Sequence, residues 1–325
     1  MIEPRVAGPP AKNRNWGTWP QPKYLEIGSL ALRNIELDRR EEFTKARKWP
    51  MDNEQKDVKT RLGEWINREG FPYEMRVARA FQKAGFWVTQ SDYYDDPETK
   101  TRREIDVVAM FHRSFNGVVL RVEFVIECKS SKDKPWLLFC EEQERLESPA
   151  WVANRCASNM GMQVLHELSQ EKDLQKLALF RLRPPIGYGL KQAFNNENRD
   201  LAYTAMCSVG NAAKAHSIYW REYPNESAII EFIFPVIAID GQLFECHLND
   251  KEDVEISETP SATLLWRNPI TSVIHTQIDV QTSSSIDHFA VESFRAAKEL
   301  ITEKSNLILA AREKRVRKRS RRLLE

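Results

Sequence analysis

The chain has 325 residues, of which 42% are hydrophobic and 29% are charged. This balance is typical of a globular protein, and the length allows one or two domains with a sizeable core. The formal net charge of +1 excludes a uniformly basic nucleic-acid binder, so any binding field has to be local. No apolar run reaches about 18 residues, so we expect no membrane span, and five scattered cysteines predict reduced thiols.

The N-terminal part predicts an extension in front of the main domain. Residues 1–25 are rich in proline and polar side chains and read as an extended arm. They lack the apolar segment of a secretory signal, which predicts a cytoplasmic protein. Residues 26–68 are charge-rich and helical in pattern. The extension is predicted to cover 1–63, so it ends within this helical region. Its expected core contacts are Leu30, Leu32, Ile35, Phe43 and Trp65.

Residues 71–86 predict an amphipathic helix. Pro72 suits a first helical turn, and Gly85 suits the end of the helix. Glu74 lies in the first turn, beside the apolar stripe, so its carboxylate can point toward a neighbouring sheet. The expected stripe consists of Phe71, Met75, Ala78 and Phe81.

Two apolar runs predict strands that end in charged residues. The run 103–109 places Asp106 within a strand, and the run 118–126 leads into Glu127 and Lys129. Residues two apart on a strand point to the same side, so Glu127 and Lys129 share a face. Such a set of two acids and a lysine suits metal-dependent hydrolysis of a phosphodiester.

The chemistry requires these residue types. Mg²⁺ prefers hard oxygen ligands and retains several waters, so Asp106, Glu127 and the backbone carbonyl of Cys128 are the candidate ligands. The metal polarises the phosphoryl group and lowers the pKa of a bound water. Lys129 would orient that water or offset charge on the phosphate, and it is also a candidate base because burial lowers the pKa of a lysine.

Glu74 on a helix, followed by Asp106 and then by Glu127-x-Lys129, resembles the PD-(D/E)xK nuclease superfamily and most closely its Mrr-like restriction endonuclease branch. The resemblance covers about 64–138, and Ile105 stands where many members have proline. It implies an α/β fold with a restriction-endonuclease-like core, in which helices flank a mixed central sheet in the order helix, three strands, helix, strand.

The same resemblance implies the activity and the roles of the residues. By that likeness Asp106 and Glu127 are metal ligands, Lys129 is the catalytic lysine and Glu74 is the supporting acid. It implies an endonuclease that uses Mg²⁺, with Mn²⁺ as a substitute, acts on double-stranded DNA and serves in defence against foreign DNA.

An ordinary structural interpretation competes with this one. A Glu-x-Lys pair is often an ion pair on an exposed strand, in which case Glu123, Glu127 and Lys129 would form a solvated, charged face. A first-turn glutamate such as Glu74 often complements only the helix dipole. Order and spacing favour the functional interpretation, because Asn116-Gly117 predicts a hairpin between the two strands.

The remainder of the core region (64–225) and the C-terminal region (226–325) predict further elements. Gly187 and Gly189 fall in an expected loop, and Pro235 is expected to break its strand or to place it at an edge. Whether 226–325 continues the sheet or forms a separate domain stays open. The expected elements are helices within 148–180 and over 201–220, a loop over 181–198, and strands over 228–240, 243–248, 262–267 and 272–280.

Basic residues supply candidate nucleic-acid contacts. Lys132 and Lys134 follow the Glu-x-Lys motif, where a phosphate contact and an ordinary polar turn both fit. A helix expected from about Asp287 ends in the segment 312–322, where eight of eleven residues are basic. Such a segment attracts phosphate without reading sequence, although a solvated terminus is the ordinary interpretation. The candidate contacts in the tail are Arg315, Arg317, Lys318 and Arg319.

We therefore expect a Mg²⁺-dependent nuclease that acts on nucleic acid, with DNA favoured over RNA. Two alternatives remain: a catalytically silent module of the same fold that binds nucleic acid or protein, and a nuclease subunit that is active only in a larger complex. Cutting both strands requires two sites, so a homodimer or a partner subunit stays open.

Overall fold

A computed structural model describes residues 53–130, 133–140, 155–170, 177–194, 200–222, 229–267 and 275–322. The chain divides into two units, 1–57 and 58–325, and the second contains the sheet and its helices. The expected arm lies outside the described residues, as do four of the five core contacts predicted for residues 26–68. The fifth, Trp65, lies on α1 (Asn53–Arg68) and is 44% exposed, so its predicted burial is wrong.

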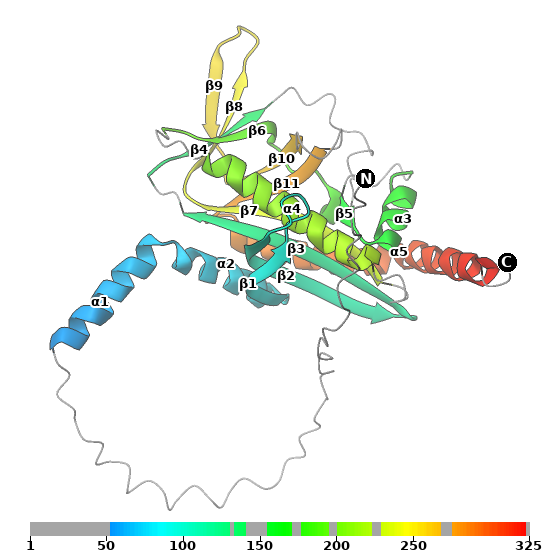
Figure 1. Ribbon diagram of the computed structural model, residues 1–325. Helices are drawn as coiled ribbons and strands as arrows, with labels where there is room; N and C mark the ends of the chain where they lie inside the picture. The colour runs from blue at the N-terminus through cyan, green and yellow to red at the C-terminus, as the bar shows by residue number, and fades with distance from the viewer. Residues whose placement is uncertain are drawn as a thin grey trace, which may run out of the picture. The chain divides into compact units, whose positions relative to one another are not determined.

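One mixed sheet of eleven strands organises the second unit (Figure 1). Its order is β1-β2-β3-β7-β11-β10-β6-β4-β8-β9, and the short β5 pairs with β7. Strand β2 is antiparallel to both of its neighbours, β1 and β3, whereas β3, β7 and β11 are parallel. The prediction of a mixed α/β fold is thus confirmed. The strands are β1 Trp87–Asp95, β2 Arg102–Phe115, β3 Val118–Ser130, β4 Trp136–Cys140, β5 Cys156–Ala157, β6 Ile186–Gln192, β7 Ile229–Asp240, β8 Leu243–Leu248, β9 Val254–Glu258, β10 Ser261–Arg267 and β11 His275–Thr282.

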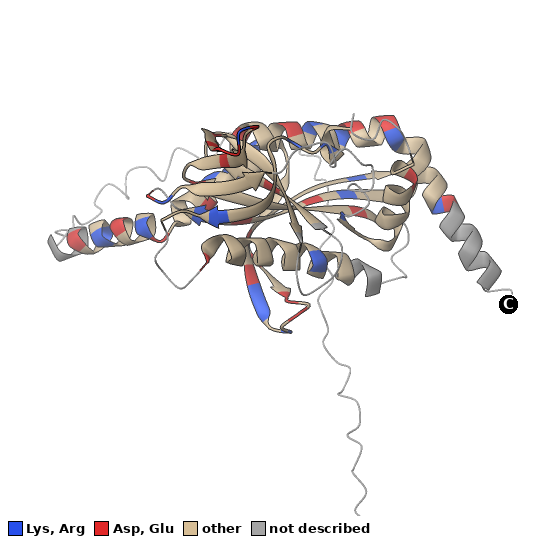
Figure 2. Cartoon of the chain, turned by 90° about the horizontal axis from the view of Figure 1, so that it is seen from above, with Lys and Arg blue, Asp and Glu red and all other residues tan. Residues whose placement is uncertain are grey.

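Helices cover both faces of this sheet. Three of them, α2 (Phe71–Ala84), α3 (Asn159–Leu168) and α5 (Ile286–Arg322), share one hydrophobic core with one face, and α4 (Leu201–Glu222) shares a second core with the other. Figure 2 shows α5 and α4 on opposite sides of the strands. A short 3₁₀ helix, Ala178–Phe180, completes the elements. Over the described ranges, no helix is long and apolar enough to cross a membrane.

Strand β3 is buried on both sides, which removes the solvated-face interpretation. Phe124 and Ile126 lie in the first core, and Val125 lies in the second. Glu123 is only 3% exposed and Glu127 only 8%. Because α4 covers their face of the sheet, these acids are part of a buried layer.

The predicted hairpin between β2 and β3 is confirmed. Phe115 pairs with Val118 across Asn116 and Gly117, whose φ angles are 46° and 74°. A two-residue hairpin turn of this kind needs positive φ at both positions, which Asn and Gly tolerate best.

The later strands belong to the same sheet, and that sheet rolls back on itself. Only two residues separate Asp240, the end of β7, from Leu243, the start of β8, and they span at most about 11 Å. Four strands lie between β7 and β8 in the sheet order, which would be about 24 Å on a flat sheet. The strands from β7 to β8 therefore curl, and the second core fills the inside of the curl.

Two predictions about single residues are wrong. Gly187 and Gly189 lie in strand β6, not in a loop. A glycine is required at position 187 because a Cβ there would come within 2.4 Å of Leu138 on the paired strand β4. Pro235 neither breaks β7 nor lies at an edge. It falls where one side of β7 changes partner, from β5 at Ile233 to β11 at Val236, so the ladder on that side is interrupted there.

Helix α2 forms as predicted but packs through a different row of side chains. It ends at Ala84, and Gly85 caps it with φ 112°. Of the expected stripe, Ala78 and Phe81 are buried, whereas Met75 is 55% exposed. The sequence carries two apolar rows, and the sheet takes the one formed by Tyr73, Val77, Ala78, Ala80 and Phe81.

The described part of the predicted helical region 148–180 contains one α-helix, α3, and the short 3₁₀ helix Ala178–Phe180. Ser158 caps α3 by accepting a hydrogen bond from the Gly161 N–H at 3.1 Å. Helix α4 and strands β7, β8, β10 and β11 lie close to their predicted ranges.

Candidate active site

The candidate site lies where β2 separates from β3. The ladder between them runs up to the pair Val107–Ile126, so the next pair, Asp106 and Glu127, stands just beyond it. Beyond this point the Cys128 N–H donates to Asp106 Oδ2 at 2.6 Å. β3 itself continues, paired with β7, to Ser130. A carboxylate thus occupies the opening between two diverging strands.

Glu127 is held from two directions on the α4 side of the sheet. Lys129 Nζ donates to Glu127 Oε1 at 2.5 Å, and the Ser208 hydroxyl donates to Glu127 Oε2 at 2.6 Å. Both oxygens of this buried carboxylate are therefore engaged. The expectation that Glu127 and Lys129 share a face is confirmed.

The Cys128 side chain points the other way. Its thiol is buried in the first core, and burial raises the pKa of that thiol well above its ordinary value. Only the backbone of Cys128 therefore faces the site. The role of its carbonyl as a metal ligand stays a prediction.

Asp106 has an unusual protonation equilibrium. Burial, together with the negative charge of Glu127, raises its pKa to about 7, although the Cys128 N–H and Lys129 pull it down. Burial is the larger cause of this raised pKa and the charge of Glu127 the second, so two acidic groups lie close together where water solvates them poorly. Such a site favours an additional cation.

The neighbouring Glu127 favours the charged form of Lys129. Burial by itself would lower its pKa, but the adjacent Glu127 carboxylate outweighs burial and raises the pKa above its ordinary value. The direction of this shift is opposite to the one that a role as base requires, and the catalytic role of Lys129 stays a prediction. The positive charge remains available to a phosphate.

Glu74, on α2, interacts electrostatically with Glu127 and Lys129. It is half-buried, and burial together with the nearby Glu104 raises its pKa, while Lys129 lowers it. Glu104 itself is exposed. The structure thus brings Glu74 close enough to Lys129 and Glu127 for their charges to interact, as the resemblance implies.

The donor set suits Mg²⁺ better than zinc. Within the described part of the chain, no three His, Cys, Asp or Glu side chains are grouped so as to hold a metal ion. Two carboxylates with a backbone carbonyl are a sufficient set for Mg²⁺, which keeps several waters, whereas structural zinc needs four ligands from the protein. Asp106 and Glu127 would hold the ion.

Two residues of the site escaped sequence analysis. Ser208 on α4 orients Glu127, and the Tyr94 hydroxyl donates to the Ser208 carbonyl at 3.2 Å. Burial raises the pKa of Tyr94 to about 12. The available signal was that Ser208 is a polar residue on the apolar stripe formed by Ala205, Val209 and Ala212.

The predicted nucleic-acid contacts are mostly distant or outside the described residues. Lys132 lies outside them, and Lys134 is half-buried before β4. The backbone of α5 carries the basic tail, and Arg312 donates to the Asn116 carbonyl at the hairpin tip at 3.0 Å. That tip is about 30 Å along β2 from Asp106. The structure does not bring the start of the tail to the acids. The side chains of Arg315, Arg317, Lys318 and Arg319 are outside the described residues.

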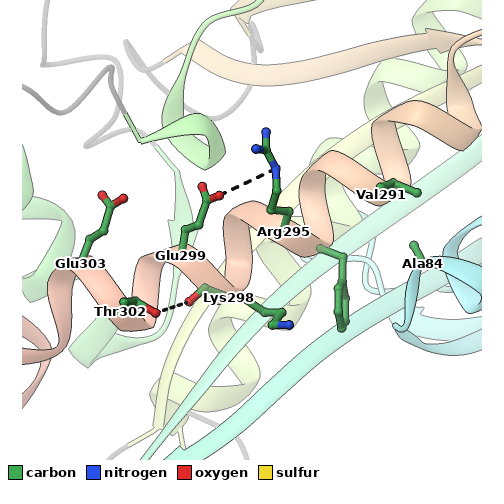
Figure 3. Close-up of a pocket in the computed structure, with 8 residues that line it drawn as sticks. Ala84, Val291, Arg295, Lys298, Glu299, Thr302 and Glu303 are labelled. Carbon is green, nitrogen blue, oxygen red and sulfur yellow. Dashed lines mark hydrogen bonds and ion pairs between the residues drawn. The ribbon is translucent and has the colours of Figure 1, made fainter.

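A hollow of about 440 Å³ lies along α5, against the end of α2 (Figure 3). Ala84 at its edge is ten residues from Glu74, about 15 Å along α2. Its polar side chains interact within α5, for example Arg295 with Glu299 at 3.7 Å. We assign it no role in the chemistry.

Comparison of the chain with protein-family models, with curated proteins and with solved structures gives no match.

Proposed function

We propose that this protein is a Mg²⁺-dependent nuclease, able to use Mn²⁺, that hydrolyses phosphodiester bonds in nucleic acid. One observation carries the proposal. Asp106 and Glu127 lie together at the opening between β2 and β3 with a single lysine, and the pKa of Asp106 is raised to about 7. Two carboxylates that lie close together and are poorly solvated form an environment that a divalent cation stabilises.

In this proposal each residue of the site has a separate role. Asp106 and Glu127 would hold the ion, which when bound activates a water and polarises the phosphoryl oxygen. Ser208 fixes one oxygen of Glu127, and a fixed carboxylate costs less reorganisation during the reaction. Lys129, as an ammonium, offsets the charge that develops on the phosphate.

The order of the elements supports the proposal. Helix α2, strands β1 to β3, helix α4 and strand β7 follow one another as the resemblance to PD-(D/E)xK nucleases implies, with β4, β5, α3 and β6 inserted before α4. Parallel β7 beside β3 extends the sheet past the acids.

Cleavage of supercoiled plasmid, linear duplex and single strands tests the proposal. The wild type is assayed with Mg²⁺, with Mn²⁺ and with EDTA, beside Lys129→Ala and the control Lys83→Ala, which removes an exposed lysine of α2. We expect metal-dependent cleavage that falls at least about 100-fold in Lys129→Ala and is unchanged in Lys83→Ala. Equal activity of both variants would refute the proposed site, and nucleic acid that is bound but uncut by the wild type would indicate a silent binding module.

A further inference from the structure

A polar groove of about 560 Å³ opens beside the candidate catalytic residues. It lies where the curled sheet meets itself, at the end of β7, the link from β9 to β10, and the end of β11. We call it the strand-end groove. The lining residues used below are Asp240, Gln242, Glu258, Thr259, Thr282 and Ser284.

The groove adjoins the site through two contacts. Asp240 pairs in register with Ser130, the residue after Lys129, across neighbouring strands about 4.8 Å apart. Arg76, two residues after Glu74 on α2, forms an ion pair with Asp240 at 3.0 Å. Lys129 and Asp240 both lie at the ends of their strands but on opposite faces of the sheet, Lys129 beside Glu127 under α4 and Asp240 beside Arg76 of α2. A substrate whose phosphate lies at Lys129 would therefore pass over the strand ends to place its next part in the groove.

The lining of the groove is rich in hydrogen-bond acceptors. Asp240 and Glu258 contribute carboxylates, and Thr259, Thr282 and Ser284 contribute hydroxyls. Gln242 Nε2 donates to Glu258 Oε1 at 3.4 Å, which holds that carboxylate at the rim. No Lys or Arg occurs among the residues that line it in the described part of the chain. Carboxylates repel phosphate but accept hydrogen bonds from amino and hydroxyl groups.

We infer that the strand-end groove receives the base and sugar of an unpaired nucleotide, so that the enzyme cuts nucleic acid where it is single-stranded. The inference rests on the proposed nuclease function. A continuous duplex presents phosphates on its outside and pairs its amino groups inside, so it would bring anions against Glu258, whereas the charge of Asp240 is offset by Arg76. An unpaired nucleotide turns its base edge outward instead. The volume also lies within the range of small-ligand sites.

The acceptors also imply a base preference. Glu and Asp accept a hydrogen bond from the amino group of cytosine, and adenine carries a comparable amino group, whereas thymine has none. We therefore expect cytosine- and adenine-rich single strands to bind better than thymine-rich ones.

Fluorescence anisotropy with labelled single-stranded 15-mers of dC or dT, and with a blunt duplex, tests the inference in Ca²⁺, which we use to hold nucleic acid without cleavage. Glu258→Ala is compared with Glu255→Ala, which removes the same charge from the same strand on its other face, where Glu255 accepts from Asn249 at 2.9 Å. We expect Glu258→Ala to weaken binding of the dC strand about tenfold and to leave duplex binding unchanged. Removing a negative charge on electrostatic grounds alone would strengthen binding, and we expect at most that from Glu255→Ala.

The outcomes separate the two proposals. Binding of the dC strand by Glu258→Ala as tight as by the wild type, or wild-type preference for the duplex, would overturn the inference. Cleavage with Mg²⁺ by the wild type alongside such a result would leave the nuclease proposal intact. Glu258-dependent binding of single strands without any cleavage would retain the groove and refute the nuclease.

Discussion

At the residue scale, Asp106 and Glu127 lie just beyond the ladder between β2 and β3, and Lys129 and Ser208 hold the two oxygens of Glu127. The sequence places Asp106 in one strand, Glu127 and Lys129 in the next, and the hairpin between them. The sequence does not reveal that Glu127 is buried under α4, because that depends on a helix about 80 residues later. The pKa of Lys129 is raised and not lowered, because the Glu127 carboxylate on the same strand outweighs the effect of burial.

Replacement of Asp106 by Asn should stabilise the protein at alkaline pH. The pKa of Asp106 is raised to about 7, so between about pH 4 and pH 7 the folded chain holds a proton that the unfolded chain has lost. Its contribution to stability is therefore complete below about pH 4 and is lost as the pH rises through about 7. An Asn is neutral throughout and can still accept from the Cys128 N–H.

Thermal unfolding in EDTA measures this effect. At about pH 8 we expect Asp106→Asn to exceed the wild type by at least about 1.4 kcal/mol, the value of one pKa unit. The difference should vanish near pH 4. A variant that unfolds at or below the wild-type temperature at pH 8 would contradict the raised pKa.

Loss of the Ser208 hydroxyl should weaken the site without altering the fold. We expect Ser208→Ala to reduce metal affinity or metal-dependent cleavage by about 10- to 100-fold, because Glu127 loses the donor that fixes Oε2. Ser208→Thr keeps a hydroxyl and should restore most of the loss. Mn²⁺ titration distinguishes this role from a purely structural one, and unchanged affinity in Ser208→Ala would exclude it.

At the element scale, the sequence predicts elements better than the faces through which they pack. Helix α2 has two apolar rows, and only the sheet decides that Tyr73 and Val77 are buried while Met75 is exposed. Glycine is ambiguous in the same way. The sequence around Gly187 predicts a loop, but Gly187 is a strand residue at which Leu138 approaches the backbone.

Substitution of Gly187 tests that close approach. We expect Gly187→Ala to destabilise the protein by about 1–3 kcal/mol, because the added methyl would meet Leu138 Cγ at 2.4 Å and the Phe139 carbonyl at 2.8 Å. Gly189→Ala, in the same strand, would meet Phe139 only at 3.6 Å and should change stability little. Denaturant unfolding compares the two, and equal effects would refute the packing argument.

At the scale of the whole molecule, the curl of the sheet brings distant residues to one place. Asp240, Glu258 and Thr282 lie on three separate strand ends, and their meeting beside Lys129 follows from strand order and not from local pattern. Sequence reasoning could not find the groove for this reason. It also could not show that α5 starts its basic tail at the hairpin tip, about 30 Å from the acids.

That separation predicts the effect of removing the tail. A chain ending at Glu313 should bind single-stranded and duplex nucleic acid more weakly at low salt, with a shallower dependence of affinity on salt, because fewer counterions are released. Its kcat should be unchanged, since the acids stay in place. Anisotropy at several salt concentrations and single-turnover cleavage measure the two quantities, and a large fall in kcat would contradict the separation.

The central claim is that Asp106, Glu127 and Lys129 form one metal-dependent hydrolytic site. Its most direct test is single-turnover cleavage of a single-stranded oligonucleotide with Mg²⁺ by the wild type, Asp106→Asn and Glu104→Gln, the last altering an exposed carboxylate on the same strand. We predict a loss of at least about 100-fold in Asp106→Asn and near wild-type rates in Glu104→Gln. Cleavage by Asp106→Asn at the wild-type rate would contradict the account.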